Sequence, residues 1–226
     1  MNRNVATLAD PPKLDTRGHQ ELRYWTGAQL RAFLEQNEGH RHWPAWFVSA
    51  FTALRRGELL GLRWRDVDLD AKRLAVRQTL LSVEYRLETS SGKTENAVRT
   101  IDLDDRTVAV LRAHRAGQLE ERLLVGTAYD DRDLVFAHPD GRPIHPDVFS
   151  QTFERRVAGA DLPRIRLHDL RHTHATLMLA GGVPVKVVSE RLGHATVGFT
   201  MGVYQHVMPG MQAEAAEKLG ALVFGS

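Results

Sequence analysis

The spacing of apolar residues changes along the chain, and this change limits the folds that the chain can adopt. In segments 67–69, 73–81, 84–88 and 99–103, apolar and polar residues alternate. Because successive side chains of a strand point to opposite faces, this alternation predicts a small antiparallel sheet of about three strands. The segments on both sides follow the period of helices instead. The sequence therefore predicts an α+β fold that is mainly helical.

Capping residues place the predicted helices. The stretch that begins at Thr26 opens with a capping box. Asp104 or Asp105 is suited to cap a helix that runs through about residue 124, and Pro146 fits the first turn of another helix. The other predicted helices cover residues 45–54, 55–62, 168–180, 184–192, 196–206 and 211–223.

Composition excludes several classes of protein. The chain has 226 residues, no cysteine and a formal net charge of +2, so disulfides and thiolate metal sites are excluded. No apolar run approaches the roughly 20 residues of a membrane span, and the first residues lack the apolar segment of a secretory signal. We therefore expect a cytoplasmic protein without a membrane partner. Residues 1–22 are polar and are predicted to be a linker or arm before one domain over 23–226.

The segment RIRLHDLRHTHATLML, residues 164–179, carries three histidines and an arginine within seven residues. His168 and His172 have the i,i+4 spacing of a zinc helix, but Asp169 stands where that motif has glutamate, and Arg171 adjoins the second ligand. A guanidinium fork beside a histidine suits a phosphate oxygen better. A structural pair of capped histidines is the alternative, and we predict no metal site.

Three further segments add candidate polar groups. In FTALRRGELLGLRW, Arg55 precedes Glu58 by three residues, which by itself is the pattern of a common surface ion pair. In ERLGHATVGFTMGVYQHV, His194 stands at a helix boundary and Tyr204 follows ten residues later. The turn-rich segment TSSGKTENAV displays Lys93, which taken alone would be an ordinary exposed lysine.

In order along the chain, ALRRGELLGLRW, SGKTENAVRTIDL, HDLRHTHATLML, GVPVKVVSERLGH and VYQHVMPGMQ resemble the catalytic domain of the tyrosine recombinase (phage integrase) family. The resemblance covers roughly residues 24–220. Each motif alone is weak, but five separated motifs in register argue strongly against chance. The resemblance implies site-specific DNA recombination, the integration or excision of a mobile element, through a covalent 3′-phosphotyrosine and without a cofactor.

The resemblance also implies a role for each matching residue. Arg55 and Arg171 would hold the non-bridging oxygens of the scissile phosphate, and Glu58 would orient Arg55. Tyr204 would be the nucleophile, and His194 would be the histidine of the L-G-H motif. These roles are physically reasonable, because preorganised cations stabilise the negative charge that accumulates on phosphate oxygens in the transition state.

Proton transfer needs further groups. A tyrosine hydroxyl, with an ordinary pKa of about 10, needs a proton acceptor to attack at neutral pH, and we predict that His168 is this base. Lys93, which matches the hairpin lysine of the family, is the predicted acid for the leaving sugar oxygen. We assign His174 to packing and treat His172 as a candidate for a supporting contact.

The resemblance extends to partners and domains. Similar proteins carry an N-terminal core-binding domain, which we expect to be absent here, and double-stranded DNA is the implied substrate. The amphipathic segment 211–223 would dock on a neighbouring copy and give a tetramer, unless it folds back on its own core. An accessory directionality protein is a further implied partner. Ala53 stands where glycine is common, and Gly198 and Gly202 lead us to expect a mobile tyrosine segment.

Two other functions compete with recombination. Segment 183–204 loosely resembles a helix-turn-helix of a non-catalytic DNA-binding protein, but it offers few side chains that could read base edges. Relaxation of DNA supercoils in the manner of a type IB topoisomerase uses the same phosphotyrosine chemistry, and strand exchange between two sites separates the two activities.

Overall fold

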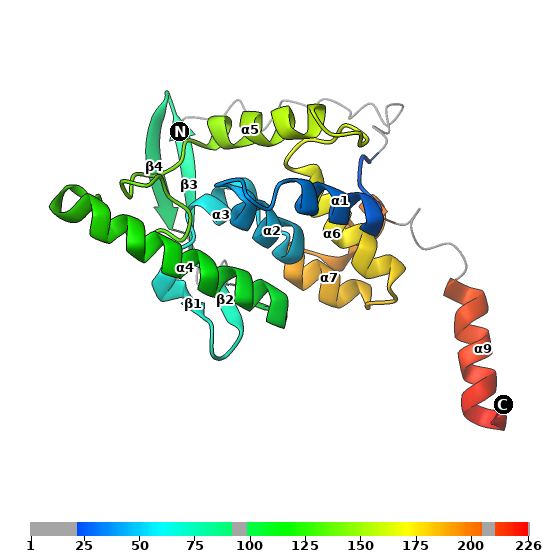
Figure 1. The fold of residues 1–226 in the computed structure, drawn as a ribbon. Coiled ribbons are helices and arrows are strands. Elements are labelled where there is room, and N and C mark those ends of the chain that lie inside the picture. Colours follow the sequence, from blue (N-terminus) through cyan, green and yellow to red (C-terminus); the bar gives the residue numbers. More distant parts are fainter. Residues whose placement is uncertain (1–21, 92–98, 205–210, 226) are drawn as a thin grey trace, which may run out of the picture.

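The structure is a computed structural model that describes residues 22–91, 99–204 and 211–225 (Figure 1). The predicted linker over 1–22 therefore lies almost wholly outside the described residues, as does Lys93. The helices are α1 (Gly27–Gln36), α2 (Trp43–Thr52), α3 (Arg56–Leu60), α4 (Asp105–Val125), α5 (Pro146–Ala158), α6 (Asp169–Ala180), α7 (Val185–Leu192), α8 (Val197–Tyr204) and α9 (Met211–Phe224). Two short 3-10 helices cover Trp64–Asp66 and Gly126–Ala128.

The strands form two separate antiparallel sheets. Strands β1 (Val67–Asp68), β2 (Arg73–Val76) and β5 (Arg99–Asp102) form one sheet in the order β1-β2-β5. Strands β3 (Gln78–Val83) and β4 (Arg86–Ser91) pair only with each other in the described chain. The predicted mainly helical α+β fold with a small antiparallel sheet is confirmed.

One detail of the strand prediction is wrong. The alternation predicts a single strand over 73–81, but the chain divides into β2 and β3 at Arg77 and changes its pairing partner there. The alternation continues across the break because Leu74, Val76 and Leu80 are all buried. The period of apolar residues reports which face is buried, and it carries no information about which strand lies alongside.

Two predicted helix caps are present. The Thr26 hydroxyl accepts a hydrogen bond from the backbone N–H of Gln29, whose side chain accepts one from Thr26 N–H. The Asp104 carboxylate accepts hydrogen bonds from the backbone N–H groups of Arg106 and Thr107 at the start of α4. Each cap satisfies backbone donors that have no partner inside the helix.

The interior contains a large and a small apolar cluster. Tilted and edge-on aromatic rings fill the middle of the large cluster, where Phe33 lies 5.0 Å from both Trp25 and Phe153 between ring centroids. The small cluster contains residues from α6, α7 and α8, and Tyr204 belongs to it. Helix α6 contributes Leu170 to the first cluster and Ala175 to the second, so this helix joins the two.

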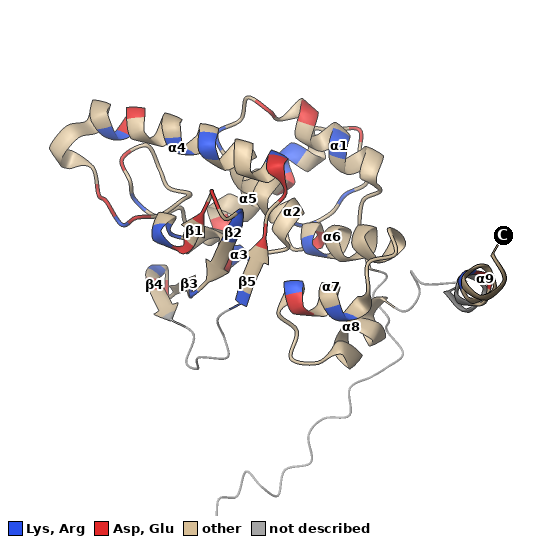
Figure 2. Ribbon diagram, turned by 90° about the horizontal axis from the view of Figure 1, so that it is seen from below, with Lys and Arg blue, Asp and Glu red and all other residues tan. Residues whose placement is uncertain are grey.

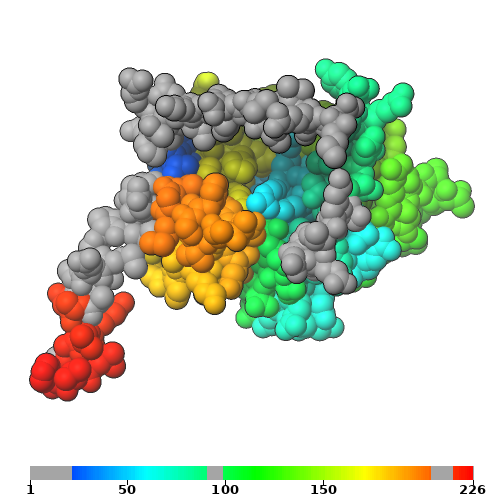
Figure 3. Space-filling view, turned by 180° about the vertical axis from the view of Figure 1, so that it is seen from behind, coloured from blue at the N-terminus to red at the C-terminus, as the bar shows by residue number. Residues whose placement is uncertain are grey.

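Helix α9 lies apart from the rest of the molecule in Figures 1 and 3. It exposes a row of large apolar side chains, Leu219, Leu222, Val223 and Phe224. None of the helices in the described parts of the chain has both the length and the apolar character needed to span a membrane.

Candidate active site

Three arginines from different elements converge on the C-terminal end of α7, which lies beside β5 in Figure 2. The last carbonyl groups of a helix lack partners within it and carry partial negative charge, so they attract cations. The carbonyl groups of residues 191, 192 and 193 accept hydrogen bonds from Arg99 Nε at 3.2 Å, Arg171 Nη2 at 2.5 Å and Arg55 Nη2 at 3.2 Å, respectively. One helix end therefore fixes three cations.

Gly193 makes this arrangement possible. It ends α7 with a left-handed backbone, φ 66°, which glycine adopts without steric penalty. A Cβ atom at this position would lie 2.9 Å from both Cδ and Nη1 of Arg99. In Figure 3 the orange surface of α7 and α8 lies beside a cyan surface from an earlier part of the chain, and Arg55 contacts the Gly193 carbonyl, so the turn brings distant parts of the sequence together.

Glu58 is the carboxylate at the centre of the cluster. It lies three residues after Arg55, accepts a hydrogen bond from Arg55 Nη1 at 2.9 Å, and accepts two from Arg99 at 2.9 and 2.6 Å. Burial alone would raise the pKa of Glu58, but the hydrogen bonds and charges of Arg99 and Arg55 lower it to about 2. Glu58 is therefore ionised and holds two guanidinium groups in place.

Arg171 is buried, with only 4% of its surface exposed. Its Nη1 donates a hydrogen bond to the Ala53 carbonyl at 2.6 Å, and Ala53 has a left-handed backbone, φ 55°, at the end of α2. Burial, together with the charges of Arg55 and Arg99, lowers the pKa of Arg171 to about 10. Since its hydrogen-bond partners are carbonyls, the cluster holds three guanidinium groups around one carboxylate and carries excess positive charge.

Two histidines border these arginines. His168 lies at the N-terminal end of α6 and is exposed, and desolvation by its neighbours and the charge of Arg171 lower its pKa. His194 Nδ1 shares a hydrogen bond with Thr200 Oγ1 at 2.8 Å. Partial burial and the charge of Arg171 lower the pKa of His194 to about 4. Both rings are therefore neutral at physiological pH.

Tyr204 reaches this site from the last turn of α8. Its side chain is 1% exposed, and its hydroxyl lies 2.8 Å from His172 Nδ1. Burial raises the pKa of Tyr204 to about 12, although the charge of Arg171 acts in the opposite direction. The sequence leaves open whether this tyrosine docks on its own chain, and the structure places it there, against α6.

The sequence interpretation missed two contacts. It places Arg99 only at the start of a strand, and it does not place His172 on the Tyr204 hydroxyl. For Arg99 a signal existed: alternation puts it on the same face as Ile101, which is buried, so an arginine stood at a core-facing position. For His172 the sequence carries no such signal, because its contact with Tyr204 depends on how α8 packs against α6.

Two other tyrosines and His174 do not join the site. Tyr24 and Tyr85 are exposed. His174 is buried between the Ala50 carbonyl, 2.8 Å from its Nδ1, and Arg191 Nε, 3.2 Å from its Nε2, so it acts in packing. In the described ranges, no three histidine, aspartate or glutamate side chains gather as a metal site would require.

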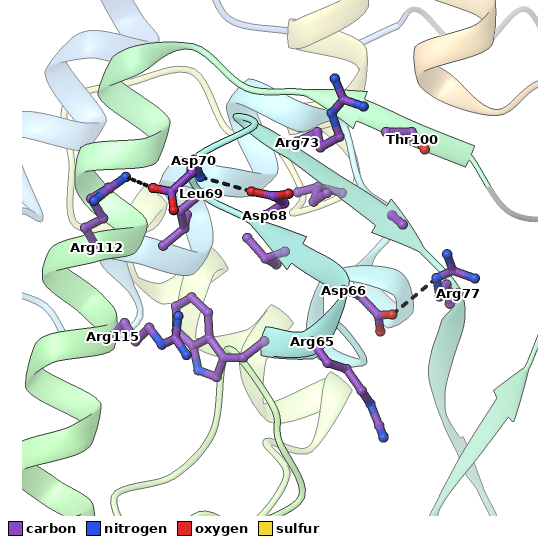
Figure 4. A pocket seen from close by; sticks show the side chains of 14 residues that line it. Arg65, Asp66, Asp68, Leu69, Asp70, Arg73, Arg77, Thr100, Arg112 and Arg115 are labelled. Atoms are coloured by element: carbon purple, nitrogen blue, oxygen red, sulfur yellow. Dashed lines mark hydrogen bonds and ion pairs between the residues drawn. The ribbon is translucent and has the colours of Figure 1, made fainter.

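A cavity of about 670 Å³ lies away from these residues, against β1, β2 and α4 (Figure 4). Five arginines line it, but so do three aspartates, and ion pairs join Arg77 to Asp66 at 3.3 Å and Arg112 to Asp70 at 2.6 Å. The cavity contains none of the predicted site residues. Three of its five arginines, Arg65, Arg77 and Arg112, form ion pairs with aspartates.

A buried tyrosine beside clustered arginines and neutral histidines, on a mainly helical domain, defines a candidate phosphoryl-transfer site with a tyrosine nucleophile. Comparison with known proteins agrees with this class. The Phage integrase family matches residues 29–210, and the chain belongs to this family. The resemblance inferred from the five sequence motifs is thereby confirmed.

Two curated relatives show the extent of the similarity. A tyrosine recombinase XerC-like protein of Caldanaerobacter subterraneus subsp. tengcongensis is 34% identical over 215 residues, which cover 89% of this chain and 55% of the relative. The ICEBs1 integrase of Bacillus subtilis is 28% identical over 206 residues, which cover 90% of this chain and 56% of the relative. The chain spans about half the length of these relatives.

Solved structures share the fold. The Tn1549 transposon integrase in complex with transposon right end DNA matches with a TM-score of 0.77 and 20% identity, over 97% of this chain and 71% of that one. The XerA recombinase matches with a TM-score of 0.68 and 23% identity, over 87% and 64%. The catalytic domain of bacteriophage HP1 integrase matches with a TM-score of 0.56 and 20% identity, over 91% of this chain and 99% of that domain.

Proposed function

We propose that the chain cleaves and rejoins DNA strands in site-specific recombination, through a covalent bond between Tyr204 and a DNA 3′-phosphate. The observation that carries the proposal is the excess positive charge around Arg171, where the carboxylate of Glu58 pairs with Arg55 and Arg99 and the guanidinium of Arg171 bonds, among the described residues, only to carbonyls. The charge of the buried Arg171 opposes folding, and an anion bound beside it would offset this cost. A phosphodiester at this point would meet the hydroxyl of Tyr204.

The proposed reaction needs no metal ion. Arg55 and Arg171 would donate hydrogen bonds to the non-bridging oxygens, where negative charge accumulates in the transition state. The Tyr204 oxygen would form a bond to phosphorus while the bond from phosphorus to the 5′ oxygen of the next sugar breaks. In this proposal Lys93 gives a proton to that oxygen and His194 supports the phosphate. The phosphotyrosine keeps the energy of the broken bond, so another DNA end can be joined without a nucleotide cofactor.

The proposed partners are double-stranded DNA and further copies of this chain. The relatives that share its fold include XerH site-specific recombinase bound to its difH DNA substrate, and a related placement of DNA here would explain the arginine cluster. Helix α9 would dock on a neighbouring copy and help to form a tetramer, because it lies apart from its own body and exposes Leu222 and Phe224. We extend the proposal to a cytoplasmic location, to the integration or excision of a mobile element, and to an accessory protein that sets direction.

Covalent capture from a pool of DNA sequences tests the proposal and selects the target site. The protein is incubated with a pool of nicked duplexes that carry a randomised central segment, and complexes that survive denaturation are collected and sequenced. We expect a DNA adduct that maps to Tyr204, a shared sequence among the captured duplexes, and no adduct with Tyr204→Phe. An adduct that persists in Tyr204→Phe would overturn the assignment. Relaxation of supercoiled DNA without exchange between two captured sites would indicate a topoisomerase-like activity.

A further inference from the structure

The Tyr204 hydroxyl has one hydrogen-bond partner among the described side chains, and that partner is His172. The distance from the hydroxyl oxygen to Nδ1 is 2.8 Å, and the ring centroids of the two residues lie 5.8 Å apart. The hydroxyl is removed from solvent, since Tyr204 is 1% exposed. The proton that must leave this oxygen therefore already lies on a path to a ring nitrogen.

We propose that His172 is a catalytic residue whose Nδ1 accepts the proton of the Tyr204 hydroxyl as Tyr204 attacks the phosphate. This inference rests on the proposed strand-cleavage function and replaces His168 as the expected base. The His168 ring stands edge-on to the His172 ring, with centroids 5.2 Å apart, and it lies at the exposed start of α6. His168 is then left to contact the phosphate beside Arg171.

The proton balance of the step is simple. The O–H bond of Tyr204 breaks and an N–H bond forms at His172 Nδ1, which requires that the neutral ring carry its own proton on Nε2. The electron pair of the hydroxyl forms the bond to phosphorus, and the bond from phosphorus to the 5′ oxygen breaks. That oxygen takes its proton from a separate acid. In the rejoining step, the His172 imidazolium returns its proton to the departing Tyr204 oxygen.

The surroundings of His172 explain why this step would wait for DNA. Burial, together with His168, Arg171 and Arg166, lowers the pKa of His172 to about 4 against the opposite effect of Asp169, while burial raises the pKa of Tyr204 to about 12. Without DNA the proton therefore stays on Tyr204. A bound phosphodiester would offset the arginine charges and make an imidazolium easier to form. The groups that face His172 are His168, Asp169, Arg171 and Arg166 from α6 and the loop before it, His194 from the loop after α7, and Tyr204 from α8.

His172→Asn separates proton acceptance from positioning, because an amide oxygen can accept the hydrogen bond of Tyr204 but cannot take its proton. The single-turnover rate of adduct formation is measured on a duplex recovered by covalent capture, with His168→Asn as the matched variant. For His172→Asn we expect unchanged DNA binding and a rate lower by a factor of about 100 or more at pH 7. Its rate should rise about tenfold per pH unit, because hydroxide replaces the missing base.

A more acidic nucleophile provides the second measurement. Replacement of Tyr204 by a fluorinated tyrosine lowers the pKa of the phenol, and we expect it to speed His172→Asn more than the wild type. A His172→Asn rate within about threefold of wild type, with the same pH profile, would overturn the proposal. The proposal would also be overturned if His168→Asn, and not His172→Asn, showed the steep rise of rate with pH. That result would assign the base to His168. If the wild type itself forms no adduct, the strand-cleavage function fails rather than the assignment of the base.

Discussion

The two sides of the candidate site are built differently. On the arginine side, Arg55, Arg99 and Arg171 each have at least two hydrogen-bond partners, and the elements next to them, α3, β5 and α6, contribute residues to the large apolar cluster. On the nucleophile side, α8 packs chiefly against α7 and contains Gly198 and Gly202; a Cβ at Gly198 would meet only Thr196 Oγ1, at 3.9 Å, and one at Gly202 would meet nothing within 4 Å. The charges that are proposed to bind phosphate are thus fixed in advance, whereas the helix that carries Tyr204 is lightly held.

This difference fits the proposed chemistry. Cations stabilise a transition state best when they do not need to reorganise at the moment of reaction. A nucleophile that must attack, remain bonded to DNA and then be displaced gains from a support that can shift. Burial and the charges of Arg55 and Arg99 lower the pKa of Arg171, so a bound anion would stabilise its charged form.

The largest expected effect follows from Arg171→Met. The substitution removes a proposed phosphate ligand, and we expect adduct formation to fall about 1,000-fold. The free energy of unfolding should change by only about 1 kcal/mol. Burial of the Arg171 charge opposes folding, and relief of that penalty offsets the two carbonyls left without a donor. Chemical denaturation and a gel assay for the adduct measure the two quantities. A loss of activity that is matched by global unfolding would contradict the functional assignment of Arg171.

Glu58→Gln should lower the stability of the fold and change the dependence of that stability on pH. Glu58 accepts hydrogen bonds from Arg55 and Arg99 and has its pKa lowered to about 2, against 4.5 for the free side chain. A lowered carboxyl pKa stabilises the fold above pH 4.5, and this contribution of about 3 kcal/mol is lost as the pH falls through 2. We expect Glu58→Gln to lower the free energy of unfolding by about that amount at pH 7. The free energy of unfolding of this variant should also fall less as the pH drops below 4.5. An unchanged acid profile in denaturant titrations would show that Glu58 is not held by the arginines.

His174 should give the free energy of unfolding a second, separate dependence on pH. Burial and the charge of Arg191 lower its pKa to about 4, against 6.5 for the free side chain. Because the unfolded chain binds the proton more tightly, stability is full above pH 6.5 and falls by about 3 kcal/mol as the pH drops to 4. His174→Gln should remove part of this slope between pH 6.5 and 4 in thermal or denaturant unfolding. A slope equal to that of the wild type would exclude His174 as its source.

The smallest expected effects come from two glycines, one on each side of the site. A Cβ at Gly57 in α3 would lie 2.6 Å from Thr79 Cγ2 and 2.7 Å from the Leu80 carbonyl oxygen, whereas nothing lies within 4 Å of a Cβ at Gly202. We expect Gly57→Ala to destabilise the protein by about 1–3 kcal/mol through overpacking. Gly202→Ala should stabilise α8 by about 1 kcal/mol and slow its amide hydrogen exchange. Equal effects at the two positions would remove the contrast between the two sides.

The sequence predicted the fold class and helix order because these depend on local period and on caps such as Thr26 and Asp104. The division of segment 73–81 into two strands could not be predicted, since a change of partner leaves the alternation intact. The sequence also carried no sign that three arginines bind the C-terminal end of α7. Gly193 predicted the end of a helix, but the three carbonyls there are filled from residues 21 to 138 positions away.

The central claim is that the arginines of this site balance the negative charge of a DNA phosphate. The most direct test measures adduct formation by wild type and Arg171→Met on a captured duplex whose scissile phosphate is replaced by an uncharged methylphosphonate. A neutral linkage has little charge to balance, so we expect the roughly 1,000-fold difference between the proteins on natural DNA to shrink below about tenfold. A difference as large on the neutral linkage as on the natural one would contradict the account.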